Sequence, residues 1–180
     1  QTLSDHGHTA DAVRFFTKQG ENSFAWMWTA NHATTLWEAL PTASDAVTMK
    51  AAHEGSLNHP MQGGYDTWFY QNIAGLRPLE AGYRKLLFVL PDVSGIHQAS
   101  GTIDTPYGKA VSSWNEKDGS VLWEGTVPAN TSAEVVVPAN KSVMVNGHSV
   151  SNMKQVRVVR TNSKGTVYAF PSGTFKIELK

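Results

Sequence analysis

The chain has 180 residues, of which 41% are hydrophobic, so it can bury a core. Lysine plus arginine and aspartate plus glutamate number 15 each, and this balance speaks against a nucleic-acid or anionic-membrane partner. Cysteine is absent, which excludes disulfides and thiolate metal sites, and no apolar run is long enough to span a bilayer.

The first 81 residues have mainly helical periodicity. Apolar residues recur at helical spacing between positions 9 and 19 and again between positions 65 and 76. A shorter helix is predicted to begin at Thr35 or Leu36 and to end at or before Pro41. So few helical residues make a thin core, and we therefore expect residues 1–81 to be the C-terminal segment of a larger helical domain.

The segment "SFAWMWTAN", from Ser23 to Asn31, places Trp26 and Trp28 at alternate positions. Phe24 has the same parity. This pattern is typical either of a surface on which a ligand stacks or of one side of an extended segment packed in a core. The core interpretation is the more economical for at least one of the two tryptophans.

From about residue 82 the pattern changes to short runs rich in β-branched and aromatic residues, separated by Gly, Pro, Asn, Asp or Ser. Residues 82–180 are therefore predicted to form an antiparallel β-sandwich of about eight strands. The Asp118-Gly119 pair predicts a tight hairpin, and residues 162–166 predict another. The predicted strands are "KLLFVLP", "GKAVSSW", "SVLWEGTVP", "SAEVVVP", "SVMVNG", "QVRVVRT", "GTVYAF" and "TFKIELK".

Glu38 has two interpretations. Thr35-Leu36-Trp37-Glu38 fits a capping box, in which the Glu38 side chain would reach back to the backbone N–H of Thr35. Alternatively, Glu38 lies in a cleft as a general base or nucleophile, with Trp37 packed nearby. Periodicity alone favours the capping box.

His59 also has two interpretations. It precedes Pro60 and can be a loop residue that is hydrogen-bonded to the backbone. The Gly63-Gly64 pair and the helix start that follows also suit the close approach of a hydroxyl-rich or anionic ligand. The cluster of Asp5, His6 and His8 fits no standard zinc motif, so neither a metal nor a cofactor is expected.

Five segments, in order, resemble the C-terminal part of bacterial α-L-rhamnosidases of glycoside hydrolase family 78. They extend from about Ala33 to Phe175, and they are "ATTLWE", "GSLNHPMQGGYDTWFYQNIAGLRP", "TPYGKAVSSW", "VPANTSAEVVVP" and "SGTF". The resemblance implies that residues 1–81 are the tail of an (α/α)6 barrel, followed by a β-sandwich at residues 82–180. It also implies inverting hydrolysis of a terminal α-L-rhamnosyl bond, in which one carboxylic acid protonates the leaving oxygen and a second carboxylate activates water.

The resemblance assigns roles to individual residues. Glu38 matches the family's general base and His59 matches a ligand of the sugar, while Trp37 and Trp68 flank these motifs and support the pocket. The family's general acid lies in an upstream motif that has no counterpart in this sequence, so the isolated chain is expected to be inactive. The implied partners are a rhamnose-containing glycoside or polysaccharide and an N-terminal part of the same polypeptide, with no nucleic acid and no membrane.

Two other functions stay open. The β half and the many tryptophans also fit a non-catalytic carbohydrate-binding or scaffold module, and a six-hairpin glycosidase can act on another sugar. Family habit favours a bacterial periplasmic or extracellular location over the cytoplasm.

Overall fold

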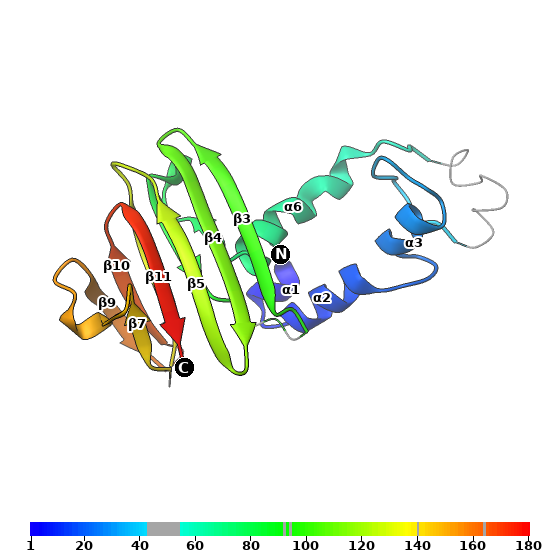
Figure 1. Ribbon diagram of the computed structural model, residues 1–180. Coiled ribbons are helices and arrows are strands. Elements are labelled where there is room, and N and C mark those ends of the chain that lie inside the picture. The colour runs from blue at the N-terminus through cyan, green and yellow to red at the C-terminus, as the bar shows by residue number, and fades with distance from the viewer. Residues whose placement is uncertain (43–54, 92, 94, 140, 164) are drawn as a thin grey trace. The chain divides into compact units, whose positions relative to one another are not determined.

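The computed structural model divides the chain into two compact units, Gln1–Trp68 and Phe69–Lys180 (Figure 1). It describes residues 1–42, 55–91, 93, 95–139, 141–163 and 165–180. In the sequence, the residue pattern changes from helical to strand-like near residue 82. The compact units of the structure divide after Trp68 instead. The domain boundary at residue 82 stays a prediction.

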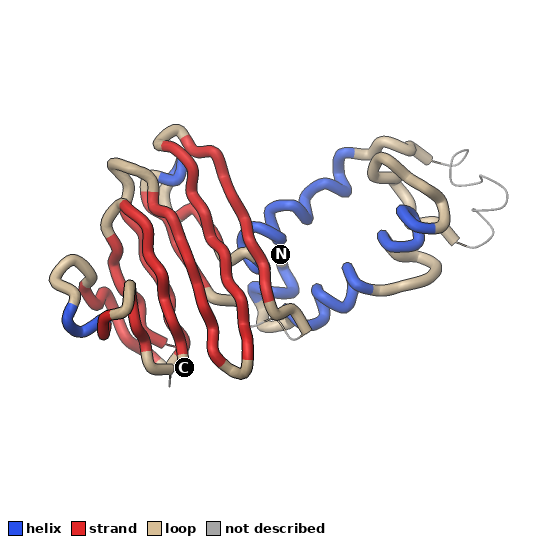
Figure 2. The backbone as a smooth tube through the Cα atoms, viewed as in Figure 1, coloured by secondary structure: helices blue, strands red, loops and turns tan. Residues whose placement is uncertain are grey.

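The first unit contains short helices, and their lengths follow from short apolar stripes interrupted by Gly, Asn and Pro (Figure 2). The predicted helix at residues 9–19 is confirmed as α2. The helix α3 begins at Ser23, whose side chain accepts a hydrogen bond from the backbone N–H of Trp26 at 3.0 Å. The helical elements are α1 (Thr2–Asp5), α2 (Thr9–Thr17), α3 (Phe24–Thr29), the 3₁₀ turn η1 (Pro60–Gly64) and α6 (Tyr65–Trp68).

Aromatic rings hold this unit together. Phe16 of α2 stacks on Phe24 of α3, with ring centroids 5.4 Å apart, and on Trp68 of α6, at 5.1 Å. Trp68 is almost fully buried, and its indole N–H donates to the Ser4 hydroxyl at 2.7 Å. Elements far apart in the sequence are thereby joined, which offsets the marginal stability of such short helices.

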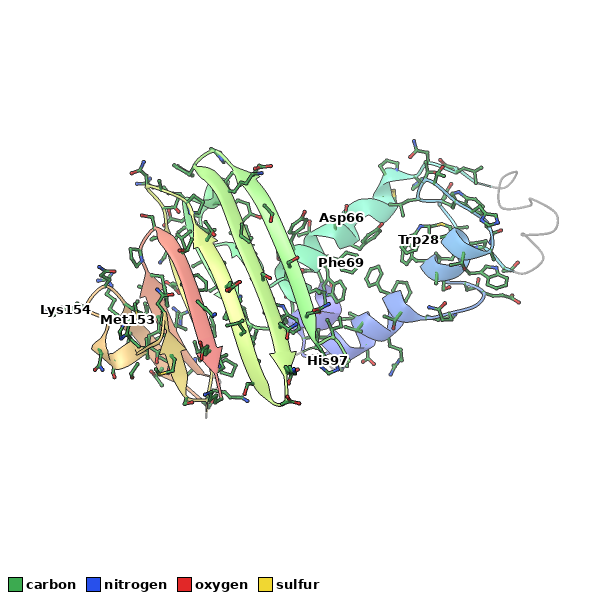
Figure 3. All side chains as sticks on the ribbon, viewed as in Figure 1. Trp28, Asp66, Phe69, His97, Met153 and Lys154 are labelled. Carbon is green, nitrogen blue, oxygen red and sulfur yellow. The ribbon has the colours of Figure 1, made fainter. Side chains whose placement is uncertain are left out.

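Three expectations for this unit are wrong. Residues 35–41 form no helix, because Thr35 and Glu38 hydrogen-bond to the backbone of residues 56 and 57 rather than to their own turn. The pair Trp26 and Trp28 lies on a helix, not on an extended segment. Trp28 is 43% exposed, and it stacks on Phe24 (Figure 3).

The third wrong expectation is a regular helix from residue 65 to residue 76. A π-helical turn, η2 (Phe69–Ile73), follows α6 directly, and Leu76 already begins a strand. A π turn has more residues per turn than an α-helix, so side chains at α-helical spacing no longer share one face. Phe69, the first residue of this turn, is 37% exposed, although helical spacing predicts that it lies on the same buried face as Trp68 (Figure 3).

The second unit is a β-sandwich of two sheets. One sheet has the strand order β1-β2-β6-β10-β9 and the other has the order β3-β4-β5-β11-β7-β8. The described residues therefore show more strands than the eight predicted. The strands are β1 (Leu76–Pro78), β2 (Lys85–Val89), β3 (Gln98–Thr105), β4 (Gly108–Lys117), β5 (Ser120–Val127), β6 (Ser132–Pro138), β7 (Val143–Val145), β8 (His148–Ser149), β9 (Arg157–Asn162), β10 (Gly165–Phe170) and β11 (Gly173–Leu179).

The sandwich is not wholly antiparallel. Strands β2 and β6 pair in parallel, with Lys85 opposite Ser132 and Val89 opposite Val136, which corrects the predicted antiparallel arrangement. The other strand pairs are antiparallel, and the hairpin between β4 and β5 turns at Asp118 and Gly119, as predicted. Both residues have positive φ, at 52° and 76°, which is the backbone that an Asp-Gly turn supplies.

The core of the sandwich lies between the two sheets and centres on Phe88, Trp123 and Phe175. The Phe88 and Phe175 rings meet edge to face at 5.1 Å. The π turn is fastened to this unit by side chains of β4, since the Trp114 indole N–H donates to the Ile73 carbonyl at 2.8 Å and the Ser112 hydroxyl donates to the Ala74 carbonyl at 2.6 Å.

The architecture is therefore mostly a β-sandwich with few helices. Within the described residues, no helix is both long enough and apolar enough to cross a membrane.

Candidate active site around Glu38 and His59

The candidate site is built where two segments of the first unit pair. The backbone N–H of Glu38 donates to the Ser56 carbonyl at 2.8 Å, and the backbone N–H of His59 donates to the Leu36 carbonyl, also at 2.8 Å. These bonds run in opposite directions between residues 36–38 and residues 56–59. The two candidate residues, which are 21 positions apart in the sequence, thereby become neighbours in space.

Apolar side chains anchor both segments. Trp37 is 8% exposed and packs in a core cluster with Phe24 and Met27. Leu36 and Leu57 pack against the same cluster, one from each segment. Burial of these side chains fixes the backbone on both sides of the site, and the polar side chains that alternate with them are left at the surface.

The carboxylate of Glu38 meets groups from the opposite segment. The backbone N–H of Ser56 donates to Glu38 Oε2 at 2.9 Å, and His59 Nδ1 lies 3.7 Å from the same oxygen. The Glu38 side chain is 51% exposed and that of His59 is 24% exposed. A solvent-accessible carboxylate beside an imidazole can accept a proton from water, and the imidazole can contact a polar ligand.

This geometry bears on the two interpretations of Glu38. The capping box is wrong, because the Glu38 carboxylate hydrogen-bonds to the N–H of Ser56 across the pair of segments. The alternative interpretation requires the side chains of Glu38 and His59 to converge on one open concave surface. The structure places His59 Nδ1 3.7 Å from Glu38 Oε2, and the cleft itself stays a prediction. Their roles as general base and sugar ligand stay predictions.

His59 owes its orientation to the elements on either side of it. It occupies the position before η1 with extended backbone, and Pro60 begins the 3₁₀ turn. On its other side, the backbone N–H of Asn58 donates to the Ser56 hydroxyl at 3.2 Å. The sequence-based view of His59 as a residue just before a glycine-containing turn therefore describes its local structure correctly.

The two predicted tryptophans lie in the core of the unit. Trp37 packs in the cluster with Met27, and Trp68 is 2% exposed between Phe16 and Ser4. Both side chains therefore support the fold of the unit. Their assignment as substrate-binding residues stays a prediction.

Sequence reasoning missed the contributions of Gly55 and Ser56. A Cβ atom added to Gly55 would lie 3.3 Å from Glu38 Oε2, so this carboxylate packs directly over the glycine. Ser56 contributes through its backbone, which leaves no mark in a side-chain pattern. The one available signal is the small residue at position 55, four residues before His59.

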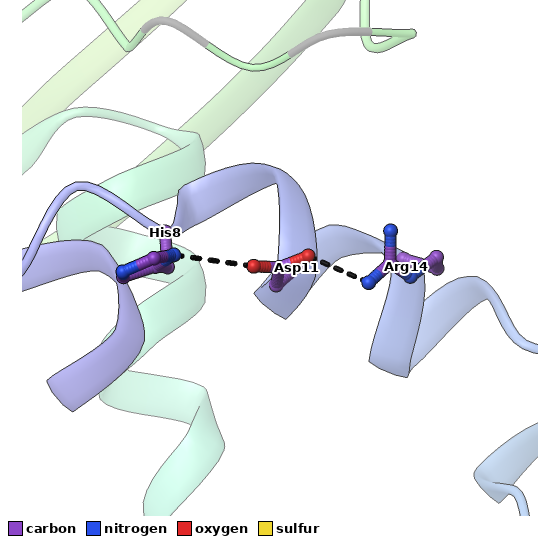
Figure 4. A network of polar contacts seen from close by, with 3 residues as sticks. All are labelled: His8, Asp11 and Arg14. Carbon is purple, nitrogen blue, oxygen red and sulfur yellow. Dashed lines mark hydrogen bonds and ion pairs between the residues drawn. The ribbon is translucent and has the colours of Figure 1, made fainter.

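The N-terminal histidines take part in surface contacts. His8 Nδ1 lies 3.3 Å from one Asp11 carboxylate oxygen, and Arg14 donates to the other at 2.6 Å (Figure 4). All three side chains are exposed, and they run from the N-cap of α2 (His8) through its first turn (Asp11) to its last turn (Arg14). Among the residues that the structure describes, no group of three His, Cys, Asp or Glu side chains is arranged to hold a metal ion.

Comparison with known proteins gives the same family over both units. Residues 1–73 match the model of the bacterial α-L-rhamnosidase six-hairpin glycosidase domain, and residues 75–152 match that of the bacterial α-L-rhamnosidase C-terminal domain. An α-L-rhamnosidase of Formosa agariphila is 31% identical over 87% of this chain, and one of Alteromonas sp. is 35% identical over 67% of it.

Solved structures agree. The crystal structure of Streptomyces avermitilis α-L-rhamnosidase complexed with L-rhamnose has a TM-score of 0.80 at 27% identity, over 99% of this chain. That of α-L-rhamnosidase from Dictyoglumus thermophilum has a TM-score of 0.80 at 26% identity, also over 99% of this chain. The chain covers only 17% and 19% of these two proteins, and 17% and 13% of the Formosa and Alteromonas relatives. By sequence and by fold, the chain belongs to the bacterial α-L-rhamnosidase family.

Proposed function

We propose that this chain carries part of the active site of a glycoside hydrolase that removes terminal α-L-rhamnose from glycosides or polysaccharides. The observation that carries the proposal is the convergence of Glu38 and His59, whose side chains approach to 3.7 Å on paired segments. Family membership supports the substrate class, since one relative of similar fold was crystallised with L-rhamnose.

In the proposed reaction Glu38 is the general base. Its carboxylate takes a proton from a water molecule as the water oxygen bonds to the anomeric carbon, and the glycosidic bond breaks with inversion. A carboxylic acid on the opposite side gives its proton to the leaving oxygen, at a separation of about 6.5–9.5 Å from the base. We propose that this acid lies outside these 180 residues, and that residues 1–81 complete an (α/α)6 barrel with it.

His59 is proposed to hydrogen-bond to hydroxyl groups of the sugar. Both imidazole nitrogens can take part in hydrogen bonds, one as donor and one as acceptor in the neutral ring. Because His59 lies beside Glu38 Oε2, a sugar ring bound to His59 would lie within reach of the water that Glu38 activates.

The variant Glu38→Gln tests the proposal when it is made in the full-length protein that the gene encodes. Glutamine keeps the size of the side chain but cannot take a proton, so kcat on an aryl α-L-rhamnoside should fall by about 10²–10⁴-fold. The matched control is Glu124→Gln, an exposed carboxylate on β5, which should leave kcat unchanged. The anomer of the first-formed sugar, read by proton NMR, reports inversion.

Full activity of Glu38→Gln would overturn the assignment of the base. Activity on other aryl glycosides but not on the rhamnoside would overturn the substrate class. Saturable binding of rhamnosides without turnover, unaffected by Glu38→Gln, would favour a carbohydrate-binding module instead.

A further inference from the structure

We propose that the backbone N–H of Ser56 is the group that positions the Glu38 carboxylate for catalysis, and that Gly55 is required because it lets the carboxylate approach that N–H. This inference rests on the proposed role of Glu38 as the base. It assigns a positioning function to two residues that act through Glu38.

Ser56 binds Glu38 twice. Its carbonyl accepts from the Glu38 backbone N–H at 2.8 Å, and its own N–H donates to Glu38 Oε2 at 2.9 Å. Main chain and side chain of the same glutamate are thus fixed by one residue of the opposite segment. A second link, from the Thr35 hydroxyl to the Leu57 carbonyl, holds the two segments together beside this double contact.

The N–H of Ser56 makes a closer contact with the carboxylate than the imidazole does. His59 Nδ1 lies 3.7 Å from Oε2, beyond the range of a direct hydrogen bond, whereas 2.9 Å from Ser56 N is the ordinary length of a charge-assisted one. The imidazole can therefore act on this oxygen by its charge or through a water molecule. The orientation of the carboxylate comes from the backbone.

Gly55 is needed for its size. A Cβ at this position would lie 3.3 Å from Glu38 Oε2 and 3.6 Å from Glu38 Cβ. The first distance is tighter than an ordinary van der Waals contact, so an alanine at this position would push against the carboxylate. By contrast, a Cβ at Gly63 or Gly64 would meet nothing within 4 Å.

The experiment compares Ser56→Pro with Ser56→Ala in the polypeptide as its gene encodes it, on an aryl α-L-rhamnoside. Both variants lack the hydroxyl, but only proline also lacks the N–H. We expect Ser56→Pro to lower kcat at least tenfold with KM within twofold of the wild type, and Ser56→Ala to keep kcat within about threefold. Gly55→Ala should also lower kcat, whereas Glu124→Gln, the exposed change on β5, should not.

A double-variant test separates positioning from a general structural defect. In the Glu38→Gln background there is no base to position, so adding Ser56→Pro should cause no further loss of rate. Circular dichroism shows whether each variant is folded. If Ser56→Pro is not, then Gly55→Ala with Glu124→Gln as its control carries the same test.

Equal kcat values for Ser56→Pro and Ser56→Ala, or a further loss in the Glu38→Gln background, would overturn the inference. If Ser56→Pro fails to fold, wild-type kcat in Gly55→Ala overturns it instead. These results leave the proposed function intact as long as Glu38→Gln alone lowers kcat by about 10²–10⁴-fold. The proposed function fails separately, if the wild type does not hydrolyse the rhamnoside or if Glu38→Gln retains full activity.

Discussion

At the scale of single residues, Glu134 is the most buried charged side chain among the described residues of the β unit. It lies on β6 with 9% of its side chain exposed, and Lys85 of β2 and Arg160 of β9 contact its two oxygens at 2.8 and 3.1 Å. The hydrogen bond from Lys85 holds the pKa of Glu134 below its ordinary value of 4.5, and the charges of Lys85 and Arg160 lower it further, while burial opposes them. One carboxylate therefore links three strands of one sheet.

The change Glu134→Gln should lower the free energy of unfolding of the β unit at pH 7 by about 1.5–3 kcal/mol, because hydrogen bonds to a charged group are lost. A depressed pKa in the folded state stabilises above the unfolded value of 4.5, and this stabilisation disappears as the pH falls through the lower, folded value. The wild type should therefore lose stability below pH 4.5 more steeply than the variant.

Chemical denaturation between pH 3 and pH 7 measures both effects, with Glu124→Gln as an exposed control. Parallel pH dependences of the wild type and Glu134→Gln would show that the Lys85 and Arg160 contacts do not stabilise the folded state.

Residue patterns alone do not reveal the candidate site. Thr35 and Glu38 have the spacing of a capping box, and only the resemblance to a family points to Glu38 as a base and to His59 as its neighbour. The physical reason is that their partners, the N–H of Ser56 and the carbonyl of Leu57, are backbone groups from another segment. Such long-range partners are invisible to any rule that looks three or four residues along the chain.

At the scale of elements, strands with strong side-chain patterns could be predicted and weak ones could not. The eight predicted segments all contain strands, because β-branched and aromatic residues dominate them. The strand β3 (Gln98–Thr105) was missed, since it is mostly polar, contains Gly101 and alternates between exposed and half-buried positions. The strand β1 (Leu76–Pro78) was missed because it is short and ends in proline.

Pairing between β5 and β11 depends on a glycine. Gly125 lies opposite Phe175, and a Cβ at Gly125 would fall 2.1 Å from the tip of the Phe175 ring. That ring occupies the space above the glycine while it packs on Phe88 and Phe170 in the core. An aromatic ring over a glycine is a pairing that no single-strand pattern predicts.

Gly125→Ala should therefore destabilise the β unit by about 1–3 kcal/mol, because the Phe175 ring must leave its position. Thermal unfolding of the variant beside Glu124→Ala, an exposed change on the same strand, measures this effect. Adding Phe175→Leu to Gly125→Ala should make the alanine less harmful than it is in the wild type. An unchanged melting temperature for Gly125→Ala would contradict the close packing of the ring on this glycine.

At the scale of the whole molecule, the two units are held by different means. Among the described residues of the first unit the longest helix is α2, with 9 residues, and isolated helices below about 12–15 residues are marginal in water. Its stability must come from the aromatic cluster. The second unit has extended ladders of backbone hydrogen bonds and a core of fully buried side chains.

Hydrogen exchange of the 180-residue chain should therefore show slower amide exchange in β5, β6 and β11 than in α1, α2 and α3. Mass spectrometry of peptides after deuterium labelling measures the difference. The exposed edge strand β9 is an internal control and should exchange faster than the central strand β6. Equal protection of residues 1–42 and β5 would show that the first unit is as stable as the second.

The parallel pairing of β2 with β6 has a consequence for the order in which the sandwich can assemble. Between these partners the chain makes β3, β4 and β5, which pair with one another in the other sheet. Bringing β6 beside β2 closes a loop that contains this whole meander, and long loops carry the larger entropic cost. Local hairpins can form early. The five-stranded sheet is complete only when β2 pairs with β6, at the two ends of that loop. The rate of folding should thus be governed by a single distant encounter between residues 85–89 and 132–136.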